Sequence, residues 1–237
     1  MCAYWDFSLF RLDMRSGSKY NTRVFLFMKQ LVIIGAGGFG REVHNMAPFC
    51  RGYGEEFVIK GFINDITDAL DGFEGYAPII GTIKDYMPRE DDVFICAIGD
   101  IAGRKKCVNM LLERGAEFIN LVHRTAGRDR NTAIGKGCIL GIRVGISCDC
   151  KIGDFTILQD ECLVGHDTVI GDFCQLHPRV FIAGKVSLGD DVHVGPYALV
   201  HPGKKVGDGA TIGGASFVIR NVKSGSTVYG NPAKLLR

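Results

Sequence analysis

The chain has 237 residues, of which 46% are hydrophobic and 23% charged, a composition that can bury the cores of two domains. Its net charge of +2 provides no broad basic field for nucleic acid, and no apolar run approaches the roughly 20 residues that a membrane helix requires. Nine cysteines are too few in this length for a disulfide scaffold, whereas 32 glycines are about twice the usual share.

Residues 1–27 form an extension without a clear hydrophobic period, and they lack the succession of regions that a secretory signal peptide shows. Met28 directly precedes a strand-like run. Two interpretations stay open. Either Met28 is the natural start of the protein, or the extension is an arm that packs on a neighbour through Trp5, Phe7 and Phe10. We assign the extension no function.

Residues 28–122 show the alternation of strands and helices that is typical of a small Rossmann-like parallel sheet. An apolar run over 29–34 is followed at once by GAGGFG (35–40) and by a helical pattern over 41–46. Further strands are predicted over 57–63, 92–98 and 117–121, and a further helix over 103–114. Glycines between a strand and a helix let backbone N–H groups approach a phosphate at the helix N-terminus.

This glycine pattern predicts a site for a nucleotide or a nucleotide sugar, although glycines that only serve packing are the alternative. About 95 residues leave no room for the second half of a dinucleotide site, which favours a smaller nucleotide over NAD. Asn64 and Asp65 end the second predicted strand about 25 residues after Gly40, where a contact to a ribose or sugar hydroxyl would lie.

Residues 134–223 repeat with a period of six. Fifteen consecutive hexads, without an insertion, begin with Ile, Leu or Val: residues 134, 140, 146, 152, 158, 164, 170, 176, 182, 188, 194, 200, 206, 212 and 218. A fixed six-residue period indicates a parallel β-helix in which three hexads make one triangular coil. Residues 134, 152, 170, 188 and 206 are therefore expected to stack at about 4.8 Å.

Two other hexad positions are also restricted. The second is glycine in nine hexads, which we attribute to a positive φ at a tight corner. The fifth is nearly always small, and we expect Cys138, Cys150, Cys162 and Cys174 there to be buried, reduced thiols, as in a cytoplasmic protein. Cys148 and Cys150 have no second pair for zinc, and no two histidines of the repeat are a multiple of 18 apart, so no metal is expected.

The chain combines a GAGGFG-opening α/β domain with hexads that contain VGHDTVIG (164–171) and with a closing GNPAK (230–234). This combination resembles the nucleotide-amino-sugar acetyltransferases similar to bacillosamine and perosamine N-acetyltransferases, and the related sialic-acid O-acetyltransferase-like proteins. The resemblance covers about residues 29–236. It implies a left-handed β-helix and a homotrimer with acetyl-CoA between subunits. The nucleotide sugar would bind to residues 28–122, and residues 123–237 would form the acyltransferase domain with a C-terminal tail.

The resemblance also assigns site residues. The family's general base falls on His166 and its acidic neighbour on Asp167, although a solvated polar corner is the alternative for both. Gln175 stands where some relatives have a second histidine, so its role departs from the family pattern. The remaining candidates from the resemblance are Gly37, Gly38, Phe39, Asn64, Asp65 and Gly99 for the sugar nucleotide, and Gln175, Pro196 and Gly214 for acetyl-CoA. From the residues themselves, a cationic rim around coenzyme phosphates is predicted at Lys204, Lys205, Arg220, Lys223, Lys234 and Arg237, although a coil corner that bulges outward is the alternative for Lys204.

The implied function is acetyl-CoA-dependent N-acetylation of a nucleotide-linked 4-amino-6-deoxy sugar, for a surface polysaccharide or glycan. Histidine suits this chemistry because its pKa lies near the working pH and a neighbouring carboxylate orients the ring. Three alternatives stay open: a sialic-acid-type sugar O-acetyltransferase, an NAD-dependent oxidoreductase, and a scaffold trimer without catalysis. Neither nucleic acid nor a membrane is expected as a partner.

Overall fold

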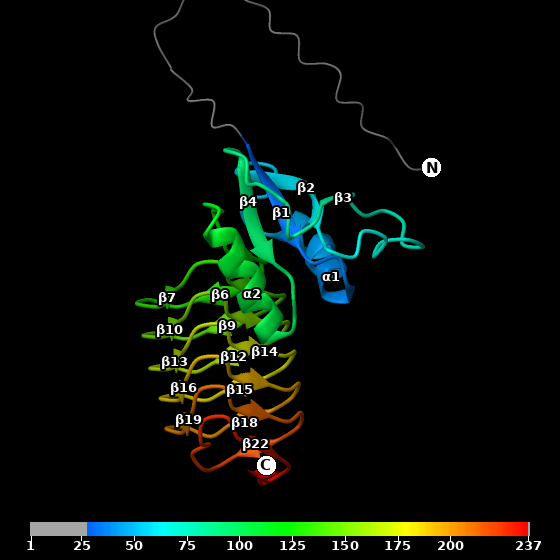
Figure 1. Ribbon diagram of the computed structural model, residues 1–237. Helices are drawn as coiled ribbons and strands as arrows, with labels where there is room; N and C mark the ends of the chain where they lie inside the picture. Colours follow the sequence, from blue (N-terminus) through cyan, green and yellow to red (C-terminus); the bar gives the residue numbers. More distant parts are fainter. Residues whose placement is uncertain (1–27, 237) are drawn as a thin grey trace, which may run out of the picture.

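The computed structural model describes residues 28–236, so our interpretations of residues 1–27 and of Arg237 lie outside the described residues. An α/β domain sits at one end of a long β-helix, and one of its two α-helices lies along the side of the nearest coils (Figure 1). No helix within residues 28–236 has the length and apolar character that crossing a membrane would demand.

The α/β domain is built on a four-stranded parallel sheet with the strand order β3-β2-β1-β4. Its elements are β1 (Lys29–Ile34), α1 (Gly38–Met46), the short 3-10 helix η1 (Ala47–Phe49), β2 (Phe57–Ile63), β3 (Ile79–Gly81), β4 (Asp92–Cys96) and α2 (Ile101–Leu112). The predicted Rossmann-like sheet is confirmed. The three-residue β3 is too short to produce a readable pattern in the sequence.

The strand predicted over 117–121 is wrong. Only Phe118 pairs with the α/β sheet, through a single bridge to Phe94. The chain then leaves that sheet, and β5 (Leu121–Val122) already pairs with the next coil of the β-helix. An apolar run of this length satisfies either sheet, so the sequence pattern does not reveal where the backbone changes from one to the other.

The β-helix is left-handed, as predicted, and consists of short strands that form three parallel sheets around a triangular core. One sheet contains β7 (Ala133–Ile134), β10 (Lys151–Ile152), β13 (Val169–Ile170), β16 (Ser187–Leu188) and β19 (Lys205–Val206). The second contains β5, β8 (Ile139–Leu140), β11 (Ile157–Leu158), β14 (Gln175–Leu176), β17 (His193–Val194), β20 (Thr211–Ile212), β22 (Thr227–Tyr229) and the antiparallel β23 (Lys234–Leu235). The third contains β6 (Gly127–Arg128), β9 (Gly145–Ile146), β12 (Leu163–Val164), β15 (Phe181–Ile182), β18 (Leu199–Val200) and β21 (Phe217–Val218).

The predicted stacking and core are both confirmed. Ile152 pairs with Ile134 of the preceding coil and with Ile170 of the following coil, 18 residues away in each direction. The fifth hexad position is buried except at the half-buried Lys204, and Cys138 and Cys174 have no exposed surface. Each of these thiols donates a hydrogen bond to a carbonyl oxygen of the next coil, at 3.2 and 3.1 Å. All cysteines within residues 28–236 are free.

The glycines at the second hexad position have a different role from the predicted one. The positive φ angles recur instead at the fourth position, at every sixth residue from Asn131 to Ala215, and even Phe155 and Tyr197 adopt them. At the second position a Cβ has no room, because one added to Gly153 would lie 2.5 Å from the carbonyl carbon of Gly171 in the next coil. Close stacking of the coils, and not corner conformation, therefore selects glycine there.

The α/β domain and the β-helix share an apolar core. Leu121, Ile139 and Ile157 project from the outer face of the second sheet, and each is at most 2% exposed. They pack in one cluster with Leu31 and Ile33 of β1. This shared core fixes the glycine loop of one domain relative to the coils of the other.

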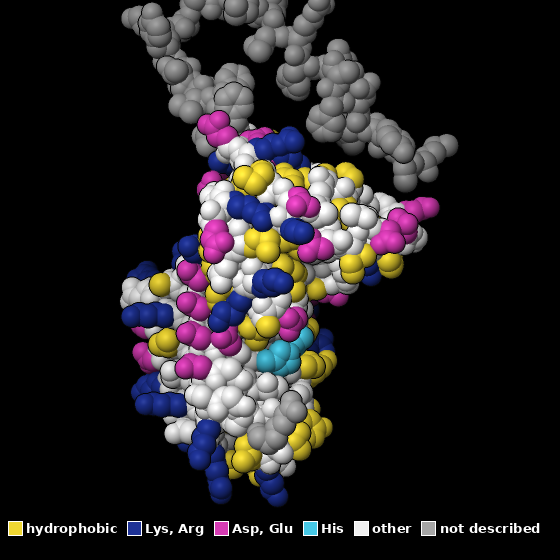
Figure 2. Space-filling view, viewed as in Figure 1, with side chains coloured by type: hydrophobic (Ala, Val, Ile, Leu, Met, Phe, Trp, Pro, Cys, Tyr) yellow, Lys and Arg dark blue, Asp and Glu magenta, His cyan; other side chains and the backbone are white. Residues whose placement is uncertain are grey.

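Aspartates at the third hexad position tie successive coils together. The Oδ1 atoms of Asp154, Asp172, Asp190 and Asp208 each accept a hydrogen bond from a backbone N–H one coil earlier, at 2.7 to 3.0 Å. These four residues share one corner, and Figure 2 shows acidic side chains aligned along the β-helix. Asp160 makes the same bond at another corner, to the N–H of Ile142 at 2.8 Å.

Candidate active site

His166 and Asp167 occupy the corner between β12 and β13. Asp167 has a φ of 57°, and its Oδ2 lies 2.8 Å from Nδ1 of His166. Both side chains are about half exposed, at 55% and 51%. A carboxylate that accepts the Nδ1 proton leaves Nε2 as the basic nitrogen, so this pair can act as a general base on an outer surface of the β-helix.

A second carboxylate lies one coil earlier than this pair. Asp149 occupies the same position as Asp167 in the preceding coil and accepts a hydrogen bond from Asn131 at 2.9 Å. The pKa of Asp149 is lowered, chiefly by that bond and by a further one from Cys148, and to a smaller extent by the charge of His166. Two carboxylates, Asp149 and Asp167, therefore lie at this corner of successive coils.

The glycine loop presents an open surface at the N-terminus of α1. A Cβ at Gly37 or Gly38 would meet nothing within 4 Å, so ligand atoms can approach both residues. Helix α1 has Gly37 as its N-cap and no side chain that caps its first N–H groups. Gly40 serves packing, since its Cβ would collide with the carbonyl oxygen of Gly35. The free N–H groups form a suitable site for a phosphate.

The parallel sheet brings the other predicted sugar-nucleotide residues to the same edge. Asn64 follows β2, and its side chain accepts from the N–H of Ala36 at 3.2 Å while it donates to the carbonyl of Ile66 at 2.7 Å. Asp65 accepts from the N–H of Ile83 at 2.9 Å. Both side chains thus shape the loops at this edge. Gly99 follows β4 and is open, with nothing within 4 Å of a Cβ.

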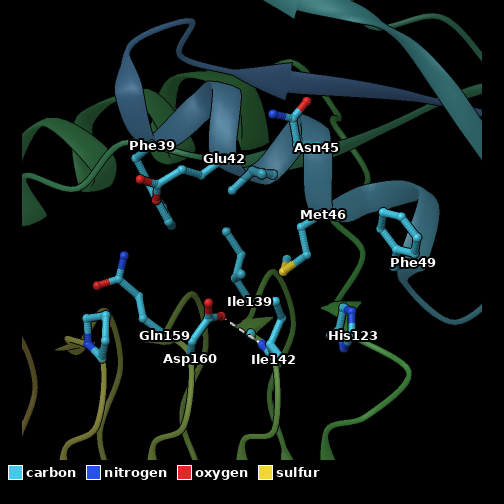
Figure 3. Close-up of a pocket in the computed structure, with 13 residues that line it drawn as sticks. Phe39, Glu42, Asn45, Met46, Phe49, His123, Ile139, Ile142, Gln159 and Asp160 are labelled. Atoms are coloured by element: carbon cyan, nitrogen blue, oxygen red, sulfur yellow. Dashed lines mark hydrogen bonds between the residues drawn. The ribbon is translucent and has the colours of Figure 1, made fainter.

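A cavity of about 460 Å³ lies between α1 and the corners of the β-helix coils (Figure 3). Phe39 of the glycine loop stands at its rim, and Met46 and Ile142 contribute apolar walls. The cavity therefore adjoins the loop at which the sequence predicts a sugar nucleotide. Its size suits a monosaccharide with part of its nucleotide.

Three hydrogen-bond acceptors reach this cavity from two distant parts of the chain. Glu42 projects from α1, whereas Gln159 and Asp160 project from the coil (Figure 3). The Oε1 atom of Gln159 is buried and has no hydrogen-bond partner within the described residues. Among those residues no lysine or arginine lines the cavity. The cavity is therefore suited to a cationic hydrogen-bond donor and not to a phosphate.

Sequence reasoning missed Glu42, Gln159 and Asp160. Glu42 reads as an ordinary exposed helix residue, and Asp160 reads as one of the structural aspartates at the third hexad position. Nothing in a single sequence indicates that positions about 118 residues apart share a cavity. The only available signal was Phe39, which belongs to the glycine motif and also lines this cavity.

Gln175 requires a correction. It is 1% exposed, and its Oε1 accepts a hydrogen bond from Nη1 of Arg104 on α2 at 2.7 Å. Arg104 also donates to the carbonyls of Phe173 and Cys174, and burial lowers its pKa. The amide of Gln175 therefore joins the two domains. Because its side chain is enclosed behind α2, it presents no surface to a coenzyme.

Pro196 and Gly214 lie one coil apart at the corner between the second and third sheets. The N–H of Ala215 donates to the carbonyl of Pro196 at 2.8 Å, and Pro196 is exposed. Asp160 lies at this same corner, whereas His166 lies at the next corner of the triangle. Further along the β-helix, a cavity of about 390 Å³ brings together three of the predicted cations, Arg220, Lys223 and Lys234.

Two histidines of the repeat form an unexpected pair. Nε2 of His177 lies 2.9 Å from Nε2 of His193, although the residues are 16 and not 18 positions apart. His177 lies in the loop directly after β14, and the pair with His193 is a contact that the sequence pattern does not reveal. Burial lowers the pKa of both imidazoles. Within residues 28–236, no group of three or more His, Cys, Asp or Glu side chains is arranged to hold a metal ion.

Comparisons with known families match both parts of the chain. Residues 30–111 match the model of the PglD N-terminal domain, and residues 167–202 match the bacterial transferase hexapeptide model with six repeats. A curated relative, an uncharacterized protein of Acanthamoeba polyphaga mimivirus, is 29% identical over 126 residues. These residues are 53% of this chain but 24% of that protein, so the chain spans about a quarter of the relative's length.

Solved structures resemble nearly the whole described chain. The acetyltransferase domain of PglB from Neisseria gonorrhoeae is 26% identical, with a TM-score of 0.78 over 88% of this chain and 100% of that domain. A mutant of perosamine N-acetyltransferase from Caulobacter crescentus, in complex with CoA and GDP-perosamine, is 25% identical, with a TM-score of 0.79 over 88% and 97%. WeeI from Acinetobacter baumannii is 27% identical, with a TM-score of 0.75 over 88% and 100%. The predicted resemblance is confirmed.

Proposed function

We propose that the chain is an acetyl-CoA-dependent N-acetyltransferase, because both of its halves resemble the bacillosamine and perosamine N-acetyltransferase-like family. Its acceptor is the amino group of a nucleotide-linked 4-amino-6-deoxy sugar, which is used to build a surface polysaccharide or glycan. The enzyme acts in the cytoplasm. The observation that carries the choice of an amine is the cavity beside Phe39, with three acceptors and no lysine or arginine among the described residues that line it.

The nucleotide and the sugar occupy adjoining parts of this surface. The phosphates bind at the free N–H groups of Gly37 and Gly38, and the sugar extends past Phe39 into the cavity. An ammonium group has three N–H donors, which Glu42, Asp160 and the unpartnered Oε1 of Gln159 can accept. A hydroxyl group has one donor and would leave two of these three acceptors without a partner.

A second copy of the chain completes the site. Asp160 and His166 lie at different corners of one β-helix. In the proposed homotrimer, the cavity of one copy faces the His166 corner of another. Apolar side chains project from the sheet between these corners, with Leu163 48% and Phe181 40% exposed, as an interface between copies requires. Acetyl-CoA lies between copies, with Pro196 and Gly214 along it and the cations of the 390 Å³ cavity near its phosphates.

In this arrangement His166 supplies general base and general acid catalysis. The bound ammonium first loses one proton to solvent, because only the neutral amine has a lone pair that can attack. Nε2 of His166 then takes a second proton as the nitrogen attacks the thioester carbonyl, and Asp167 stabilises the imidazolium. The Gly184 N–H, which has no acceptor within residues 28–236, donates to the developing oxyanion. The tetrahedral intermediate then expels the CoA thiolate, which takes the proton from His166 and leaves the amide product.

The first test is release of coenzyme A from acetyl-CoA over a panel of UDP-, GDP- and dTDP-linked 4-amino-6-deoxy sugars. A matched panel carries a hydroxyl group in place of the amine. We expect turnover with one amino sugar and none with its hydroxyl analogue. Turnover only with hydroxyl acceptors would replace the proposal by sugar O-acetylation, and failure to bind acetyl-CoA would favour a scaffold.

A matched pair of variants tests the amine pocket. Asp160→Asn keeps an oxygen for the N–H of Ile142 but removes the charge that faces the cavity. Its control is Asp154→Asn, because Asp154 makes the same bond to the N–H of Lys136 at a different corner. We expect Asp160→Asn to raise KM for the amino sugar about 10-fold, the loss of one charge-assisted hydrogen bond, while Asp154→Asn leaves KM unchanged. An equal effect of both variants would contradict the assignment.

A further inference from the structure

We propose that Gly184 is a positioning residue whose missing side chain creates the space that holds the His166 ring against Asp167. Gly184 lies in the coil that follows that of His166, at the same hexad position. The inference rests on the proposed function of His166 as the base. It concerns the absent Cβ, and it is separate from the use of the Gly184 N–H described above.

The His166 ring occupies the volume that a side chain at position 184 would fill. A Cβ built on Gly184 would lie 2.7 Å from Nε2, 2.9 Å from Cε1 and 3.1 Å from Cδ2 of His166. Carbon atoms pack at about 3.5–4.0 Å, so all three contacts are too short. One methyl group would therefore displace the whole ring face, including the nitrogen that takes the proton.

The backbone on either side of this contact cannot move away. The N–H of Lys185 donates to the carbonyl of His166 at 2.8 Å, and the N–H of Gly203 donates to the carbonyl of Gly184 at 3.0 Å. The neighbouring Ala183 is held in the same way, through its N–H to the carbonyl of Val200 at 3.1 Å. The flexible part of the contact is the His166 side chain, so the ring moves and the coils stay in place.

Backbone conformation does not explain this glycine. Gly184 does not have a positive φ, in contrast to Lys185 beside it. Hexad position three accepts large side chains elsewhere in the same β-helix, such as those of Lys136 and Asp154. Of the two physical reasons for a glycine in a strand-rich coil, conformation and close approach, only close approach applies here.

The expected consequence for the ring is loss of its orientation. The hydrogen bond from Nδ1 to Asp167 sets which nitrogen carries the proton and leaves Nε2 free to accept one. A ring displaced by a methyl group loses this bond, so the proton redistributes between the two nitrogens. The base then has the wrong tautomer for part of the time and the wrong position throughout.

The test is Gly184→Ala in the full chain, with Ser187→Thr as the control. Ser187 is exposed on β16 of the first sheet, away from the proposed interface between copies, so this control adds one methyl group to the β-helix surface. Long-range ¹H–¹⁵N spectra without substrate report the tautomer of His166, and its signal is identified by its absence in His166→Ala. Thermal melting reports the fold, and coenzyme A release reports turnover.

We expect Gly184→Ala to move the His166 signal away from the Nδ1–H tautomer and to lower kcat about 10- to 100-fold, with little change in Tm. Ser187→Thr should change none of these. An unchanged tautomer overturns the proposal even if kcat falls, since the loss would then act through the backbone of Gly184. A changed tautomer with undiminished kcat also overturns it. A changed tautomer in a protein whose wild type transfers no acetyl group supports the positioning and refutes the proposed function alone.

Discussion

The buried guanidinium of Arg104 offers the sharpest test of how the two domains are joined. It is 1% exposed and donates to Gln175 Oε1 and the Phe173 carbonyl at 2.7 Å, and to the Ile98 carbonyl at 3.1 Å. Its Nε atom has no partner within the described residues. Arg104→Met keeps most of the apolar volume but leaves these oxygens buried without a donor. Each such oxygen costs about 1–3 kcal/mol, and the effects are not additive.

We expect Arg104→Met to lower the free energy of unfolding by about 3–5 kcal/mol, the range for removal of one partner from a buried charged contact. In a chain of this size that corresponds to a fall in Tm of about 10 °C. The neighbouring Lys105 provides the control. It also joins α2 to the β-helix, through Asp191 at 2.7 Å, but the two side chains are 39% and 31% exposed. Lys105→Met should therefore cost less than about 1 kcal/mol.

Thermal melting of the full chain, followed by far-ultraviolet circular dichroism, measures both variants. A further variant, Arg104→Met with Gln175→Leu, removes one of the stranded oxygens and should recover about 1–2 kcal/mol. An equal fall in Tm for Lys105→Met and Arg104→Met would contradict the special role of the buried guanidinium. A double variant no more stable than Arg104→Met would contradict the cost assigned to the stranded oxygens.

Three further predictions concern the base, the histidine pair and the thiols. His166→Ala should lower turnover by about 10²- to 10⁴-fold in the coenzyme A release assay while acetyl-CoA still binds in calorimetry, and near wild-type turnover would exclude it as the base. Burial lowers the pKa of His177 and His193 below their unfolded values, so the unfolded chain binds more protons as pH falls below about 6.5. Tm should therefore drop between pH 7 and 5. The drop should be smaller in His193→Gln, and an equal drop would contradict the assignment. Burial raises the pKa of the Cys138 thiol to about 12, so iodoacetamide at pH 8 should label it only after unfolding, as peptide mass spectrometry can show; labelling of the native protein would be inconsistent with a closed core.

Local and periodic features of this protein could be predicted from the sequence. The hexads determine a β-helix because a six-residue period places the same residue type on the same inner face in every coil, as the pairing of Ile134, Ile152 and Ile170 confirms. The glycine loop is readable because strand, turn and helix follow one another directly. The corner at His166 was found through a family resemblance, since a histidine beside an aspartate carries little information by itself.

Tertiary structure alone decided which distant residues meet. Glu42 and Asp160 share a cavity only because the outer face of the second sheet packs on the α/β domain. The contact between Arg104 and Gln175 arises in the same way, which is why a residue predicted to touch a coenzyme is instead enclosed. The distance between coils decided the roles of the glycines, because a Cβ is excluded by the neighbouring coil and not by the residue's own φ. A period in the sequence specifies what faces inward, whereas contacts across the outer faces depend on how separate elements pack.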